Sequence, residues 1–157
     1  MKTRLAKADD LAAVTDLARR AYERYVPVIG REPMPMIEDY APRIAAGQVW
    51  LLEDEALAGM IVLEERDNTL LIFSVAVTPE RQGTGLGQEL LAFAEDVANK
   101  RGFETIELFT NAKMERNIRI YGKCGYVETR RRAHPMLAST VVVYMEKKLA
   151  AEHRRSA

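Results

Sequence analysis

The chain has 157 residues and 48% of them are hydrophobic, which suits one globular domain with a single core. Lys plus Arg and Asp plus Glu both number 23, so no net charge attracts the chain to nucleic acid or to a membrane surface. One cysteine and two histidines exclude an internal disulfide and argue against a metal cluster. We therefore expect a cytoplasmic protein with no metal, no nucleic-acid partner and no membrane segment.

The first part of the chain predicts a short strand at residues 3–8, a helix from residue 11 and a second helix at about 36–46. Two further strands are predicted at 48–53 and 58–65. Tyr22 and Tyr25 fall near the end of the first helix. The prolines and Gly30 predict a loop over Pro27–Pro35, and Pro42 is expected to kink the second helix.

The central stretch predicts a strand, a glycine loop and a helix. Leu70–Val77 is an apolar run of strand length that Pro79 ends, and three alternating glycines in Gln82–Gly87 precede apolar residues at helical spacing from Leu86. The first turn of a helix has unpaired N–H groups, and glycines let a phosphate approach them closely, so this unit predicts anion binding. It fits neither a P-loop, which needs a lysine where Gln88 stands, nor the dinucleotide pattern G-x-G-x-x-G.

After the long helix, the pattern predicts a strand at residues 105–110 and a short helix at 115–123. An antiparallel pair of strands is predicted at 126–131 and 141–147. The connection between the last two strands falls at 133–139. The sum is an α/β (α+β) fold with one layer of strands and helices on both sides. We expect residues 1–149 to form a single domain and residues 150–157 to be a flexible C-terminal tail.

Two motifs in order resemble the GNAT superfamily of N-acetyltransferases. Gln82-x-x-Gly85-x-Gly87 follows a Val-x-Pro strand end, as in that family's pyrophosphate loop, and the run from Asn117 to Tyr126 resembles its second motif, a short helix ending in Tyr-x-x-x-Gly-aromatic. The resemblance implies a single mixed, mostly antiparallel central sheet of about six or seven strands flanked by about four helices. It also implies acetyl-CoA as co-substrate.

The resemblance further implies a coenzyme site. The backbone of the strand end would pair with the pantetheine arm and the loop N–H groups would hold the pyrophosphate; these residues are Val75, Ala76, Val77, Gln82, Gly83, Thr84, Gly85, Leu86, Gly87 and Gln88. Tyr121 matches the family's tyrosine near the coenzyme sulfur and would stabilise the departing thiolate. Asn117 either contacts the pantetheine or caps and packs its helix, because the family's usual asparagine position holds Met114 here.

The acceptor side departs from the family pattern. Many members carry a glutamate on the glycine-loop strand that deprotonates the amine, but Leu70–Val75 contains no acid. The base could instead be Glu32, Asp67, His134 or water, or an amine of low pKa could need none. The residues expected to border the acceptor are Tyr25, Arg31, Phe73 and His134.

These observations predict an N-acetyltransferase that moves an acetyl group from acetyl-CoA to a primary amine by direct attack in a ternary complex. The acceptor would be a small molecule or a peptide, and a second copy of the chain is an expected partner. A covalent route through Cys124 is disfavoured, because that residue falls at the helix end behind Tyr121. The alternatives are a non-catalytic module that senses acetyl-CoA or CoA, and a purely structural or interaction domain.

Overall fold

The computed structural model describes residues 1–137 and 139–150. Apart from Ala150, the predicted C-terminal tail lies outside the described residues. The strands are β1 (Lys2–Leu5), β2 (Val49–Glu53), β3 (Leu57–Arg66), β4 (Thr69–Val77), β5 (Thr105–Asn111), β6 (Val127–Ala133) and β7 (Val141–Lys148). The helices are α1 (Leu11–Tyr22), α2 (Val26–Ile29), α3 (Met34–Ile37), α4 (Ala41–Ala45), α5 (Leu86–Lys100) and α6 (Glu115–Lys123), with single 3₁₀ turns η1 (Ala8–Asp10), η2 (Glu23–Tyr25) and η3 (Pro79–Arg81).

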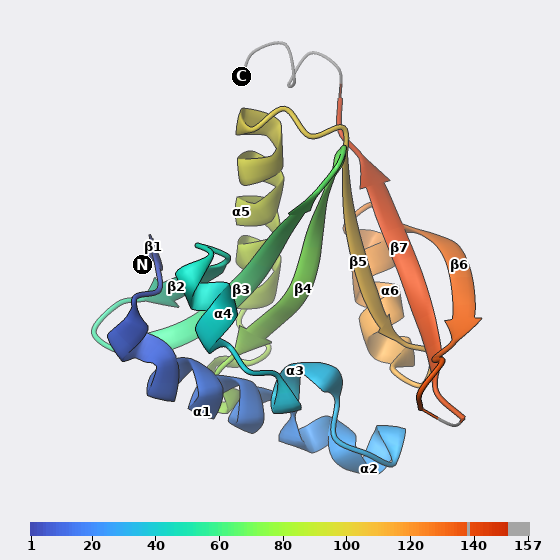
Figure 1. The fold of residues 1–157 in the computed structure, drawn as a ribbon, viewed down its shortest axis with the longest axis horizontal. Helices are drawn as coiled ribbons and strands as arrows, with labels where there is room; N and C mark the ends of the chain where they lie inside the picture. The colour runs from blue at the N-terminus through green and yellow to red at the C-terminus, as the bar shows by residue number, and fades with distance from the viewer. Residues whose placement is uncertain (138, 151–157) are drawn as a thin grey trace. The chain divides into compact units, whose positions relative to one another are not determined.

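The strands form a seven-stranded sheet in the order β1-β2-β3-β4-β5-β7-β6 (Figure 1). The pair β4 and β5 is parallel, whereas β1 with β2, β2 with β3, β5 with β7 and β6 with β7 are antiparallel. The predicted mixed, mostly antiparallel sheet is therefore confirmed.

The chain forms two compact units. Unit 1 comprises residues 1–64 and 73–94, and unit 2 comprises residues 65–72 and the chain from residue 95 onward. Because β3, β4 and α5 each run through both units, the predicted single domain at 1–149 stays a prediction.

Unit 1 holds β1, β2 and most of β3 with the helices α1 to α4. The residues of α1 that face inward are buried at helical spacing and comprise Val14, Leu17, Ala18 and Ala21. Gly59 on β3 is a point of close approach, because a Cβ there would lie 2.9 Å from the carbonyl oxygen of Ala76 on β4 and 3.2 Å from Leu90 on α5. Only a glycine fits this position without a shift of the backbone.

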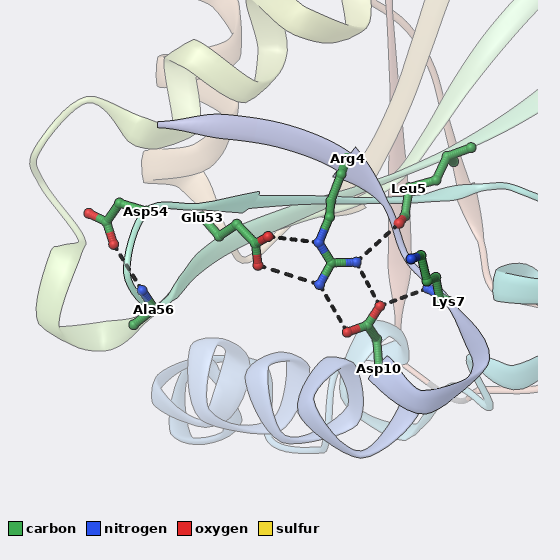
Figure 2. A network of polar contacts seen from close by, with 7 residues as sticks. All are labelled: Arg4, Leu5, Lys7, Asp10, Glu53, Asp54 and Ala56. Carbon is green, nitrogen blue, oxygen red and sulfur yellow. Dashed lines mark hydrogen bonds and ion pairs between the residues drawn. The ribbon is translucent and has the colours of Figure 1, made fainter.

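One arginine ties the N-terminal strand into unit 1 (Figure 2). Arg4 on β1 donates to Glu53 on β2 at 2.7 Å and to the two carboxylate oxygens of Asp10 at 2.8 and 3.1 Å. Asp10 also accepts the backbone N–H of Lys7 at 2.7 Å. These bonds, the one from Arg4 first, lower the pKa of Asp10 to about 2, so the carboxylate stays charged over the working pH range.

The segment between α1 and β2 differs from the prediction. The predicted loop over Pro27–Pro35 contains α2 and the start of α3, and the predicted helix at 36–46 is broken by the extended Glu38 into α3 and α4. Pro27, Pro35 and Pro42 each lie in the first turn of one of these short helices. A proline is tolerated there because its missing N–H would have no partner, so Pro42 begins a helix and does not kink one.

Unit 2 holds β5, β6 and β7 with α6 and the first residues of β4. Thr69 on β4 pairs with Thr105 on β5, and their hydroxyl oxygens lie 2.5 Å apart. Lys147 on β7 donates to Glu95 on α5 and to the carbonyl of Cys124, both at 3.0 Å, which holds the end of α6 against β7. None of the described helices is long and apolar enough to cross a membrane.

Candidate active site

The connection from β4 to α5 has the geometry of an open glycine loop. After Val77 the chain makes the turn η3, and Gly83 and Gly85 then adopt φ values of 83° and 89°, in the left-handed region that favours glycine. A Cβ added at either of them, or at Gly87, would meet no atom within 4 Å. The loop therefore leaves space beside its backbone, as a bound anion requires.

The N-terminus of α5 completes this loop. The N–H of Glu89 donates to the carbonyl of Gly85 at 3.1 Å, which is the first bond of the helix. The N–H groups of Leu86, Gly87 and Gln88 therefore have no acceptor within the helix, and the helix dipole adds positive potential there. The hydroxyl of Thr84 does not cap them, because it donates to the carbonyl of Arg81 at 2.5 Å.

The side chain of Gln82 is a bridge at the start of the loop. Its Nε2 donates to the carbonyl of Val77 at 3.0 Å, and its Oε1 accepts a hydrogen bond from Arg24 on η2. The neighbouring loop residues are held by ion pairs, Glu80 with Arg20 and Arg81 with Asp54. Sequence reasoning missed these three arginine contacts.

Tyr22 anchors the end of β4. Its hydroxyl donates to the carbonyl of Val75 at 2.8 Å and lies 3.2 Å from Oγ of Ser74, which is buried. Burial raises the pKa of Tyr22 to about 12, so the phenol stays protonated and acts as a donor. Val75 and Val77 are half-buried, and one acceptor position of the Val75 carbonyl is already used by Tyr22. The sequence predicted that Tyr22 lies near the end of the helix, but it did not predict its hydrogen bond to Val75.

The acceptor candidates of unit 1 have different surroundings. The ring of Tyr25 lies 6.0 Å from that of Tyr22 and is half-buried. Phe73 is 7% exposed and its ring is covered by the Arg43 guanidinium at 3.9 Å, so it is a packing residue in this unit. Nε of Arg31 is buried and has no hydrogen-bond partner among the described residues.

In unit 2, Tyr121 lies on α6 and is half-buried. Its ring packs edge to face against Tyr126 at 6.3 Å, and its carbonyl accepts the N–H of Cys124 at 3.0 Å. Asn117 lies one turn earlier on the same helix and is also half-buried. Met114, in the place of the family's asparagine, is the buried residue that precedes α6.

The candidate bases lie in three different connections between the helices and strands. Nδ1 of His134 accepts the N–H of Met136 at 3.1 Å, which engages this nitrogen in a backbone hydrogen bond. Asp67 lies in an exposed turn with a φ of 33°, and Glu32 is exposed. Within residues 1–137 and 139–150, no group of three or more His, Cys, Asp or Glu side chains could hold a metal ion.

Unit 1 thus contains the β4 end, the glycine loop, Tyr22, Tyr25 and Arg31, whereas Tyr121, Asn117 and His134 belong to unit 2. A mixed sheet whose central strand leads through an open glycine loop into a long helix offers a favourable place for a phosphate group at the helix N-terminus. Residues 11–126 match the model of the acetyltransferase (GNAT) family. The chain belongs to this family, which confirms the resemblance found in the sequence.

Similar proteins agree with that assignment. The uncharacterized N-acetyltransferase YvbK of Bacillus subtilis is 30% identical over 91 residues, which cover 58% of each protein, so the chain spans little more than half the length of this relative. The PaiA N-acetyltransferase of Thermoplasma acidophilum, solved with coenzyme A, is 21% identical with a TM-score of 0.73 and covers 94% of this chain and 98% of its own. YncA of Salmonella typhimurium, solved with acetyl-CoA, is 20% identical with a TM-score of 0.72, and the match covers 96% of this chain and 94% of YncA. At these identities the two structures support the fold.

Proposed function

We propose that this chain transfers an acetyl group from acetyl-CoA to a primary amine by direct attack in a ternary complex. The observation that carries the proposal is the open loop at Gly83 and Gly85, which leads into the unpaired N–H groups at the start of α5. Family membership supplies the acetyl group as the transferred unit.

The coenzyme would bind through backbone groups of unit 1. Its pyrophosphate is negatively charged, and three N–H groups at a helix N-terminus together with the helix dipole favour such a group. Its pantetheine arm contains amides that can pair with the backbone of Val75–Val77 as an added strand would. Side chains matter little in this arrangement, which explains how exposed Thr84 and Gln88 fit among the glycines.

The reaction forms one bond and breaks one. The amine nitrogen attacks the thioester carbonyl carbon, the C–N bond forms, the C–S bond breaks, and the sulfur leaves as a thiolate that takes up a proton. We assign Tyr121 the hydrogen bond to this thiolate on the strength of its position in the family motif. Holding the amine and the thioester together is itself a large contribution, worth roughly 7–11 kcal/mol in well-oriented systems.

The attacking amine must lose a proton, and the family's usual glutamate is not there to accept it. An unperturbed lysine-like amine is neutral in only about one molecule in a thousand near neutral pH. Leu70–Val75 offers no carboxylate, and Nδ1 of His134 already accepts a hydrogen bond from the backbone N–H of Met136. We therefore infer that water accepts the proton, or that the acceptor is an amine of low pKa that is already neutral.

The acceptor is a small molecule or a peptide amine, as the family's chemistry implies. Within unit 1, Arg31 is the cation that would meet it, because its Nε is buried without a partner among the described residues. Tyr25 would form the adjoining wall. A second copy of the chain as partner and a cytoplasmic location stay predictions.

Calorimetric titration with acetyl-CoA, and with free ADP as control, tests the proposal. Binding that requires the pantetheine arm is expected, followed by thiol release when a panel of amines is added. Binding without thiol release from any amine would favour a coenzyme-sensing module, which the apolar β4 keeps open as a second candidate. No binding by folded protein would show that the glycine loop is only a turn.

A further inference from the structure

Two arginines lie against the segment that begins the glycine loop and a third, Arg81, belongs to it, and the three have different partners. Arg20 pairs with the carboxylate of Glu80, and Arg81 makes a double hydrogen bond to Asp54 at 2.7 and 3.1 Å. The partner of Arg24 is the side-chain amide of Gln82, which carries no charge. Two of the three cations are thus neutralised, and the third is not.

Arg24 is held in place without being neutralised. It forms no ion pair with a carboxylate of the described residues, and its Cζ lies 5.5 Å from the ring centroid of Tyr25. Gln82 fixes the guanidinium to the loop, since the same amide also donates to the carbonyl of Val77. One N–H of the guanidinium is used by this bond, which leaves others for a ligand.

We propose that Arg24 is a binding residue for a phosphate group of the coenzyme. This inference rests on the proposed function and adds to it a side-chain contact beyond the backbone N–H groups of the loop. A guanidinium matches the geometry of phosphate oxygens, and its side chain is exposed next to the first residue of the loop. The phosphate is either one of the pyrophosphate pair or the 3′-phosphate of the ribose.

A neutral amide is a suitable partner for such a residue. A carboxylate in place of the Gln82 amide would neutralise Arg24, as Glu80 neutralises Arg20, and it would also repel an incoming phosphate. The amide orients the guanidinium and leaves its charge available. The ion pairs of Arg20 and Arg81 hold the loop but offer a phosphate no net charge, and this contrast makes them internal controls.

The test compares Arg24→Gln with the matched control Arg20→Gln, which lies one turn earlier and is paired with an acid. Dissociation constants for acetyl-CoA and for acetyl-dephospho-CoA are measured by calorimetry at low salt and at about 0.5 M salt. We expect Arg24→Gln to weaken acetyl-CoA binding by about 10-fold to 100-fold at low salt, the range of one hydrogen bond to a charged group, and less at high salt. Arg20→Gln should change it less than about threefold, and Arg24→Lys should recover part of the affinity.

The ligands distinguish the two phosphates. A loss that persists with acetyl-dephospho-CoA assigns Arg24 to the pyrophosphate, and a loss that disappears assigns it to the 3′-phosphate. The inference is wrong if Arg24→Gln binds acetyl-CoA as the parent does, or if Arg20→Gln loses as much, which would indicate a role in holding the loop. If the parent binds no acetyl-CoA, the proposed function itself fails and this inference falls with it.

Discussion

The hydroxyl of Tyr22 on α1 donates a 2.8 Å hydrogen bond to the backbone carbonyl of Val75 on β4. This bond joins the helix to the strand that leads into the glycine loop, and it lies beside the buried Ser74. Tyr22→Phe leaves the carbonyl without this donor, which should cost about 1–3 kcal/mol in the free energy of unfolding. Urea denaturation measures the change. Tyr25→Phe, which alters the neighbouring ring in the same way, should change stability by less than about 0.5 kcal/mol.

The same tyrosine gives the protein a pH dependence at alkaline pH. The pKa of Tyr22 is raised to about 12 by burial, whereas an unfolded tyrosine titrates at about 10. Its contribution to stability is therefore fully present below pH of about 10 and is lost as the pH rises toward about 12, because the unfolded chain releases the proton first. Urea midpoints measured across this range should fall, and fall less steeply in Tyr22→Phe. Equal slopes in both proteins would contradict the assignment. Burial raises the pKa of Tyr40 and Tyr126 as well, so part of the slope should remain in the variant.

Gly85 and Gly102 form a matched pair for the glycine loop. Both have a left-handed φ, 89° and 77°, and a Cβ on either would meet no atom within 4 Å. Alanine at each position should therefore cost a similar amount of stability, about 1–2 kcal/mol. Only Gly85→Ala should lose acetyl-CoA affinity, by about tenfold or more in calorimetry, since its methyl group enters the space beside the loop. Equal affinities in the two variants would argue against phosphate binding here.

Gly59 is predicted to be irreplaceable for packing. A methyl group there meets the Ala76 carbonyl oxygen at 2.9 Å, so β3 and β4 must separate. Gly59→Ala should destabilise the fold by about 1–3 kcal/mol, measured by the urea midpoint. Gly122 on α6 has open space at its Cβ, so Gly122→Ala should be neutral or stabilise by up to about 1 kcal/mol. A tolerated Gly59→Ala would show that the two strands can adjust.

Tyr121 and Tyr126 are two neighbouring tyrosines on which the role of a hydroxyl in catalysis can be compared. Tyr121→Phe should lower the rate of thiol release by about 100-fold and leave the acetyl-CoA dissociation constant unchanged, because the hydrogen bond to the thiolate is made as the sulfur departs. The control is Tyr126→Phe. The Tyr126 hydroxyl is buried without a partner among the described residues, so its removal should raise stability by about 1 kcal/mol and leave the rate unchanged. An unaltered rate in Tyr121→Phe would remove its assigned role.

Local patterns predicted much of the fold. The strand Leu70–Val77, the glycine turn and the helix from Leu86 were correct because a continuous apolar run ended by a proline, a cluster of glycines and helical spacing are all recognised within a few residues. The prolines misled the prediction for the segment between α1 and β2, because the effect of Pro42 depends on whether it falls in the first turn or the interior of a helix. The spacing of residues does not decide between these two positions.

The contacts that hold the loop were beyond sequence reasoning. Arg24 and Gln82 are separated by 58 positions, and Tyr22 and Val75 by 53. No periodicity connects such residues, and only the folded chain brings them together. The backbone ligands of the proposed site could be predicted because a motif carries them, whereas its side-chain supports could not.

The strand β6 affects how the protein behaves in concentrated solution. All seven of its residues are exposed, and among the described strands it pairs with β7 alone. An open strand edge invites pairing with another molecule, but Arg130–Arg132 and Glu128 give this one a net charge of +2, from three arginines and one glutamate. Two such edges repel each other over a distance that shrinks from about 10 Å at 0.1 M salt to about 3 Å at 1 M. Stock solutions should therefore stay clear at low ionic strength and turn cloudy first in high salt.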